Sequence, residues 1–149
     1  MSEKQISKII VRGFVDKDFD QINQLWQLTD MGGVYRGDNL IIINSTIKNG
    51  GTLFVLEDVS EQKIIGSSWL TNDSRRIYLH HFAIHPDFQG RGLSHLLLNE
   101  SLQWVKQIGL QVKLEVHRNN IKAISLYQKY GFSNLGDYMV QIIRDVSIL

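Results

Sequence analysis

The stretch from Ile77 to Ile108 constrains the fold more than any other part of this sequence. It begins with an apolar, strand-like run that ends at Ile84, continues into a short loop that contains Gly90 and Gly92, and ends in a leucine-rich run with helical spacing. Glycine lets the main chain approach a ligand closely, and the first N–H groups of a helix point toward an anion placed there. The order of strand, glycine loop and helix therefore predicts a main-chain site for phosphate.

The glycine loop alone is weak evidence, because an ordinary surface turn with a solvated Arg91 would have the same composition. A nucleotide-binding P-loop is excluded, because no Gly-Lys-Ser or Gly-Lys-Thr sequence follows the glycines. The choice between a simple turn and a phosphate site depends on the rest of the chain.

Charge and composition exclude several classes of function. The 16 basic and 15 acidic side chains leave a net charge of +1, which gives no general attraction for nucleic acid or for a membrane surface. The chain has no cysteine, so disulfides, thiolate metal sites and a cysteine nucleophile are excluded. Its five histidines are not spaced as ligands of one metal ion, and we predict no metal.

The sequence predicts one domain, in the cytoplasm. A length of 149 residues is enough for one substantial core, and no linker or repeat interrupts it, so we expect a single domain over residues 1–149. The longest aliphatic run, Leu40–Ile43, is far too short to span a membrane. The polar segment Met1–Lys8 lacks the apolar core of a signal peptide.

Residue periodicity predicts an α/β chain. Apolar alternation and β-branched residues indicate strands at residues 9–15, 52–58, 64–70, 76–84 and 111–117, and one or two closing strands over 135–148. Apolar residues three and four apart indicate helices at residues 19–28, 40–48, 93–108 and 121–130. This order predicts a central mixed β-sheet of about six or seven strands flanked by about four helices.

A second motif follows the predicted strand 111–117. It reads Asn-x-x-Ala-x-x-x-Tyr-x-x-x-Gly-Phe, and its five fixed positions are Asn120, Ala123, Tyr127, Gly131 and Phe132. Together with the glycine loop, this motif resembles the GCN5-related N-acetyltransferase (GNAT) superfamily. The acyl-CoA motif of that family, Gln/Arg-x-x-Gly-x-Gly/Ala, corresponds here to residues 89–94, with serine in the last position where the family prefers glycine or alanine.

The resemblance implies acetyl-CoA as the acyl donor and acyl transfer to an amine. It also implies a GNAT-like acyl-CoA N-acyltransferase fold. The cofactor-binding residues that it implies are Phe82, Ala83 and Ile84 for the pantetheine arm, Gln89, Gly90, Arg91, Gly92, Leu93, Ser94 and His95 for the pyrophosphate, and Asn120, Ala123 and Tyr127 on the second motif. Phe82, Ala83 and Ile84 would act through the main chain, with the Ile84 N–H as a donor to the thioester oxygen.

Tyr127 is the catalytic residue that the resemblance favours most, as the general acid that protonates the departing CoA thiolate. The general base remains open between Glu115, acting through water as in relatives that acetylate protein N-termini, and a strand histidine. His80 and His81 are the candidates, and in a regular strand they would point to opposite faces. An ordinary solvated glutamate at position 115 is an equally good reading.

The acceptor is the least readable part of the site. By the resemblance, the amine enters between the first two helices and the later strands, where Trp26, Asp30, Tyr35, Arg36 and Asp38 are candidates. The partner is then a small-molecule or peptide amine, without nucleic acid or membrane, and dimers are common in the family. The alternative function is a catalytically inactive CoA-binding module that acts as a sensor or partner protein.

Overall fold

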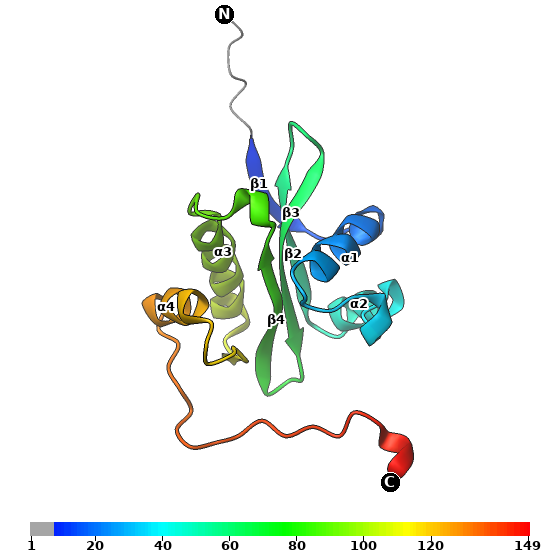
Figure 1. The fold of residues 1–149 in the computed structure, drawn as a ribbon, viewed down its shortest axis with the longest axis vertical. Coiled ribbons are helices and arrows are strands. Elements are labelled where there is room, and N and C mark those ends of the chain that lie inside the picture. The colour runs from blue at the N-terminus through cyan, green and yellow to red at the C-terminus, as the bar shows by residue number, and fades with distance from the viewer. Residues whose placement is uncertain (1–7) are drawn as a thin grey trace, which may run out of the picture. The chain divides into compact units, whose positions relative to one another are not determined.

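The structure is a computed structural model, and it describes residues 8–149 (Figure 1). Residues 1–7, which include most of the segment that argued against a signal peptide, lie outside the described residues. The chain divides into two compact units, one that ends at Glu115 and one that covers Val116–Leu149. Each unit is described by itself below.

The first unit contains a five-stranded sheet in the order β1-β2-β3-β4-β5. The strands are β1 (Ile9–Gly13), β2 (Thr52–Asp58), β3 (Lys63–Asn72), β4 (Arg76–Ile84) and β5 (Gln111–Leu114). The first four strands pair antiparallel, and β5 pairs parallel to β4. A parallel pair needs a crossover connection, and here that connection is the glycine loop followed by a helix.

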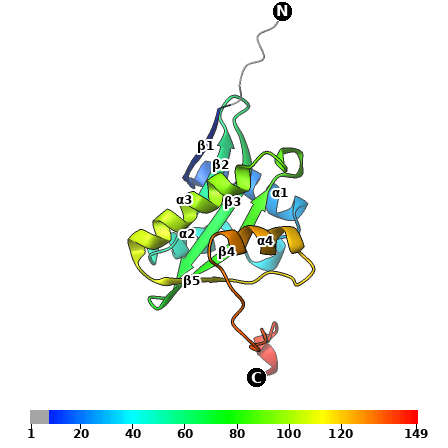
Figure 2. The same ribbon diagram turned by 90° about the vertical axis from the view of Figure 1, so that its left-hand side faces the viewer.

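Helices cover both faces of this sheet, as Figures 1 and 2 show. They are α1 (Phe19–Leu28), α2 (Leu40–Lys48) and α3 (Leu93–Ile108). One face packs against α1 and α2 in a cluster of Ile22, Trp26, Ile43, Leu53, Val55, Ile64 and Trp69. The other face packs against α3 in a cluster of Leu56, Ile65, Ile84 and Leu97. Consecutive strand residues serve opposite clusters, because side chains alternate along a strand.

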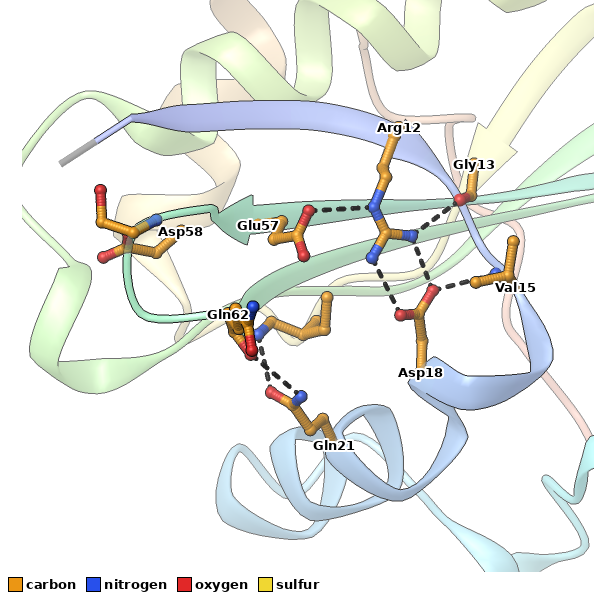
Figure 3. A network of polar contacts seen from close by, with 10 residues as sticks. Arg12, Gly13, Val15, Asp18, Gln21, Glu57, Asp58 and Gln62 are labelled. Carbon is orange, nitrogen blue, oxygen red and sulfur yellow. Dashed lines mark hydrogen bonds and ion pairs between the residues drawn. The ribbon is translucent and has the colours of Figure 1, made fainter.

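An ion-pair network joins β1 to the start of α1 (Figure 3). The Arg12 guanidinium donates to both carboxylate oxygens of Asp18, at 2.7 and 2.9 Å, and to Glu57 at 3.1 Å. Asp18 also accepts from the Val15 N–H at 2.9 Å. Burial alone would raise the pKa of Asp18, but these hydrogen bonds outweigh burial and hold the pKa below its ordinary value.

The second unit contains one α-helix, α4 (Ile121–Lys129), among its residues 116–149. The closing strands predicted over 135–148 are wrong, because the structure has no strand in this range and only a 3₁₀ turn at Val146–Ile148. Apolar composition favours a strand only where a neighbouring strand completes the hydrogen bonds. Most apolar side chains of the segment, such as Tyr138, Met139 and Ile142, are instead exposed.

The predicted fold class is confirmed, although the described residues form five strands where six or seven were expected. The bounds of α2, α3, β2 and β4 agree with the prediction. The strand predicted at 111–117 is shorter and ends at Leu114. None of the helices in residues 8–149 combines the length and the apolar character that a membrane span requires.

Candidate functional site

The glycine loop has the conformation that main-chain binding of an anion requires. Gly90 and Gly92 have φ angles of +77° and +75°, in the left-handed region that favours glycine. Neither position is crowded, since an added Cβ would meet no atom within 4 Å. α3 starts directly after Gly92, and no side chain caps its first N–H groups. The start of α3 is therefore a helix end suited to an anion from outside.

Two cations and one amide surround this loop. The Arg91 guanidinium lies 5.0 Å from the ring centroid of Phe88, and it donates to the Asp87 carbonyl at 3.1 Å. Lys63, at the start of β3, places its ammonium 5.6 Å from the same ring. The Gln89 side chain donates to the Ile84 carbonyl at 3.0 Å and ties the loop to β4. Lys63 was missed in the sequence, because only the strand register brings it here.

β4 and β5 pair over only part of their length. The register runs from Arg76 opposite Gln111 to Leu79 opposite Leu114, where β5 ends, while β4 continues to Ile84. The part of β4 that carries the predicted pantetheine-binding residues thus lies beyond the last pair with β5. A main chain in this position can accept an extended ligand as an added strand.

A β-bulge interrupts β4 just before this part of the strand. Ser67 lies opposite Ala83 and Trp69 opposite His80, so β4 contains one more residue than β3 in this interval. His81 has a φ angle of +47°, an uncommon value for a residue other than glycine. The Ser67 hydroxyl donates to the His81 carbonyl at 2.6 Å and accepts from the Trp26 indole N–H at 2.9 Å. A buried hydroxyl therefore holds the bulge in place.

The bulge places His80 and His81 on the same face, so the prediction of opposite faces is wrong. Their ring centroids lie 6.4 Å apart, and both rings contact Trp69, at 6.1 and 5.3 Å. Strict alternation holds only for a regular strand, and the extra residue with a positive φ angle turns the second histidine back.

His81 pairs with Asp38, which lies in the loop between α1 and α2. The Nε2 atom of His81 is 2.8 Å from Oδ2 of Asp38, and the same oxygen accepts from the Gly33 N–H at 3.0 Å. The His81 ring meets Trp26 edge-on, with 4.6 Å between ring centroids. Asp38 is one of the predicted acceptor-side residues, and the structure brings it to the central strand.

His80 belongs to a second group of side chains. Its Nε2 atom lies 2.8 Å from the Thr71 hydroxyl, and its ring stacks on Tyr78 at 4.1 Å. Burial, together with the neighbouring His81, lowers the pKa of His80 to about 4, which leaves this ring neutral at pH 7.

Glu115 joins the same group through Tyr78. The Tyr78 phenol hydrogen-bonds to the Glu115 carboxylate, and burial together with this bond raises the pKa of Tyr78 above its ordinary range. The Glu115 side chain, just past the end of β5, thus lies at Tyr78 and acts electrostatically on His80. Tyr78 and Thr71 were missed in the sequence, although Tyr78 lies two residues before His80 and thus on its face of the strand.

In the second unit, the Asn120 to Phe132 motif forms α4 together with the residues at its two ends. The Asn120 side chain caps α4 by accepting from the Ala123 N–H at 3.2 Å. Gly131 has a φ angle of +98° at the other end, where the Phe132 N–H donates to the Tyr127 carbonyl at 3.1 Å. Tyr127 is buried, and burial raises the pKa of its phenol to about 12.

A family model decides between a simple turn and a cofactor loop. The model of the acetyltransferase (GNAT) family matches residues 19–132, which include the glycine loop, the bulged strand and the Asn120 to Phe132 motif. The chain belongs to the acetyltransferase (GNAT) family. The resemblance that the two motifs indicate is thereby confirmed.

Solved structures agree with the GNAT fold. An aminoglycoside N-acetyltransferase in complex with CoA is 15% identical, with 96% of this chain and 99% of that chain covered and a TM-score of 0.76. An acetyltransferase from Streptococcus agalactiae is 16% identical, with 91% and 90% covered and a TM-score of 0.75. The ribosomal-protein-S18-alanine N-acetyltransferase from Escherichia coli is 20% identical, with 85% and 78% covered and a TM-score of 0.71.

As a GNAT-family acetyltransferase, the protein is an acyltransferase with acetyl-CoA as its acyl donor. The residues present fit this donor, because the glycine loop and the open end of β4 offer main-chain groups for a pyrophosphate and for amides. Among residues 8–149, no three His, Cys, Asp or Glu side chains are grouped to hold a metal ion.

Proposed function

We propose that this protein transfers the acetyl group of acetyl-CoA to a primary amine. One observation carries the proposal. The part of β4 beyond its last pair with β5 is followed by a loop with two left-handed glycines, and α3 begins after this loop without a side-chain cap. An extended ligand with an anionic end matches this order of main-chain groups. CoA is such a ligand, with its amides in the arm and its pyrophosphate at one end.

On the donor side, we assign the pantetheine arm to the main chain of Phe82, Ala83 and Ile84. The pyrophosphate is assigned to the N–H groups of residues 90–95, with Arg91 as a charge-assisted donor and Gln89 as the residue that holds the loop. Asn120 and Ala123 complete the set on α4, where the Asn120 cap shapes the helix start.

The chemistry requires a proton acceptor on the amine and a proton donor on the sulfur. The amine nitrogen attacks the thioester carbon, the C–N bond forms, and the C–S bond breaks. Tyr127 is assigned as the donor to the thiolate, and its raised pKa keeps the phenol protonated at neutral pH. The base is Glu115, acting through water, or a strand histidine, and the Ile84 N–H stabilises the developing oxyanion.

The acceptor is proposed as a small-molecule or peptide amine. Two of the similar structures are named for such acceptors, one for an aminoglycoside and one for the alanine of a ribosomal protein. The carboxylates of Asp38 and Glu115 beside the aromatic rings of β3 and β4 support a cationic acceptor.

We further propose that both units form one N-acetyltransferase domain of the cytoplasm, over residues 1–149. The family model supports one domain, because its match to residues 19–132 includes parts of both units. A homodimer is proposed from the resemblance to the family, and the exposed apolar side chains of residues 135–149 support it. Light scattering after size-exclusion chromatography measures the mass, and a monomer over the whole concentration range would rule the dimer out.

A screen of primary amines with acetyl-CoA, followed by thiol release, tests the proposed reaction. Calorimetry measures CoA binding in parallel. Acetylation of any amine, shown by mass spectrometry of the product, supports the enzyme. Tight CoA binding without turnover across amine classes would instead favour the inactive sensor module, and a chain that binds no CoA would contradict both.

A further inference from the structure

We propose that His81 is the general base and that Asp38 is its positioning residue. This assignment rests on the proposed function and chooses among the bases that it leaves open. The structural basis is the bulge in β4, which turns His81 toward the loop between α1 and α2, together with the 2.8 Å contact between His81 Nε2 and Asp38 Oδ2.

The proton positions in this pair follow from the chemistry of the partners. An ionised carboxylate only accepts hydrogen bonds, and Oδ2 of Asp38 already accepts from the Gly33 N–H at 3.0 Å. The His81 Nε2 atom must therefore carry the proton that it shares with Asp38. In the neutral imidazole the lone pair then resides on Nδ1, so that Nδ1 is the atom that can take a proton.

The Nδ1 atom of His81 is accessible. Among the described residues, no buried side-chain nitrogen or oxygen lacks a hydrogen-bond partner, and the hydrogen bond of the His81 side chain uses Nε2. The side chains of His81 and Asp38 are 17% and 19% exposed. The pair is thus largely desolvated but open at one point, which is the arrangement in which a carboxylate best stabilises an imidazolium.

The surroundings hold the pair in one orientation. Trp26 and Trp69 stack on each other at 5.4 Å, and both meet the His81 ring edge-on. The Ser67 hydroxyl holds the His81 carbonyl. Gly32 leaves no room beside the pair, because an added Cβ would lie 2.3 Å from Asp38 Oδ2 and 2.6 Å from His81 Nε2.

The neighbouring candidates are less suited to remove a proton from an ammonium. His80 has a pKa lowered to about 4, and its Nε2 atom is bonded to Thr71. The Glu115 carboxylate accepts the hydrogen bond of Tyr78. Lys113 adds a positive charge here, since its ammonium lies 4.9 Å from the Tyr78 ring centroid.

The proton balance is complete with the assigned residues. His81 Nδ1 takes one proton from the acceptor ammonium, and Asp38 stabilises the resulting imidazolium. The neutral amine attacks the thioester, and the second amine proton replaces the one that Tyr127 gives to the departing thiolate. The products are the amide and the CoA thiol, and His81 then releases its proton to solvent.

Two acceptors of equal size test the assignment. Methylamine is protonated at neutral pH and needs a base, whereas hydroxylamine is largely unprotonated and does not. The His81→Gln change should lower kcat/KM for methylamine by about 10²- to 10⁴-fold, while the rate with hydroxylamine falls far less. The Asp38→Asn change should act in the same direction by about tenfold or more, with Asp38→Glu restoring part of the rate. His117→Gln and Asp20→Asn are the matched controls, and both should behave as wild type.

A nitrogen-15 NMR spectrum of the imidazole rings adds a readout without an acceptor. His81 should show the Nε2–H tautomer in the wild type and lose this preference in Asp38→Ala. An equal loss of rate with both amines, or an unchanged methylamine rate in His81→Gln, would overturn the assignment of His81 and Asp38. Neither result would contradict the acetyltransferase activity. If the wild type acetylated neither these amines nor any in the screen, the proposed function itself would be contradicted, and with it the assignment of His81 and Asp38.

Discussion

His80 and His81 are consecutive residues of β4, and their rings nevertheless lie on the same face, 6.4 Å apart against one tryptophan. The two rings differ in their partners, because His80 bonds to the Thr71 hydroxyl and His81 to the Asp38 carboxylate. One strand therefore presents a neutral imidazole and a carboxylate-paired imidazole side by side. The two environments therefore suit the two histidines to different roles, and only His81 has a carboxylate to stabilise its protonated form.

Tyr127→Phe should remove the proton donor to the thiolate. Because the phenol, with a pKa raised to about 12, is protonated at neutral pH, its loss should lower kcat by about 10²-fold or more. CoA affinity should change little. The matched control is Tyr138→Phe, which alters an exposed phenol of the same unit. Wild-type kcat in Tyr127→Phe, measured by thiol release, would remove Tyr127 from the mechanism.

Gly92→Ala should weaken CoA binding. A left-handed φ angle of +75° disfavours alanine, at a cost of about 1 kcal/mol, and relief of this strain would redirect the first N–H groups of α3. Gly109→Ala is the control, because Gly109 ends the same helix with a φ angle of +81° and an equally open Cβ position. Calorimetry should show lower CoA affinity only for Gly92→Ala. Equal affinities in the two variants would argue against binding at the helix start.

Gly32→Ala should separate His81 from Asp38. The added methyl group would overlap both side chains, and the φ angle of +145° is itself unfavourable for alanine. We expect a large loss of acetyl transfer to methylamine with nearly unchanged CoA affinity. Gly37→Ala provides the comparison, since Gly37 lies in the same loop with a φ angle of +89° and no atom within 4 Å of an added Cβ. If both variants lost the methylamine rate equally, strain in the loop would explain the loss, and the contact between His81 and Asp38 would not.

Ser67→Ala should destabilise the protein and loosen the bulge together. The change leaves the Trp26 indole N–H and the His81 carbonyl without their shared partner, which costs about 1–3 kcal/mol for each buried group. Ser68→Ala is the control, because Ser68 is equally buried but bonds to Ser101 instead. Urea denaturation should detect a loss in both variants, and only Ser67→Ala should also lose activity. Wild-type activity in Ser67→Ala would mean that the bulge keeps its conformation without the Ser67 hydroxyl.

Asp18→Asn should lower the free energy of unfolding at neutral pH and make it vary less as the pH falls. The folded state lowers the pKa of Asp18, so its contribution is full above the unfolded value of about 3.9 and is lost as the pH falls through the folded value. Removing one partner of this largely buried pair should cost up to about 3 kcal/mol at pH 7. Melting temperatures between about pH 7 and pH 3 measure the effect. Asp20→Asn, an exposed site on α1, should keep the wild-type curve.

Much of the main chain was predictable, because local signals agree with the tertiary environment. In α3, leucines at helical spacing lie between two left-handed glycines, and the predicted bounds are the observed ones. The segment 135–148 shows the opposite case, since apolar residues alone do not provide the neighbour that a strand needs. The family was recognisable for the same reason, because its two motifs are each contiguous in the sequence.

The side-chain contacts of the proposed acceptor side could not be predicted in this way, because they depend on strand register. Asp38 and His81 are 43 residues apart, and no local pattern predicts their contact. The bulge is invisible in the sequence, where Ile77 to Ile84 reads as a regular strand. A regular strand would place the two histidines on opposite faces, and no local pattern connects Tyr78 to Glu115.

The extra residue in β4 also divides the strand into two parts, one on either side of the bulge. In the proposed reaction, residues before the bulge display side chains to the acceptor, and residues after it offer main-chain groups to the donor. Substitutions in the first half, or in the loop that carries Asp38, can alter which amine is accepted without changing the thioester end. The fold can thus acquire new acceptors while its handling of the acyl donor stays the same.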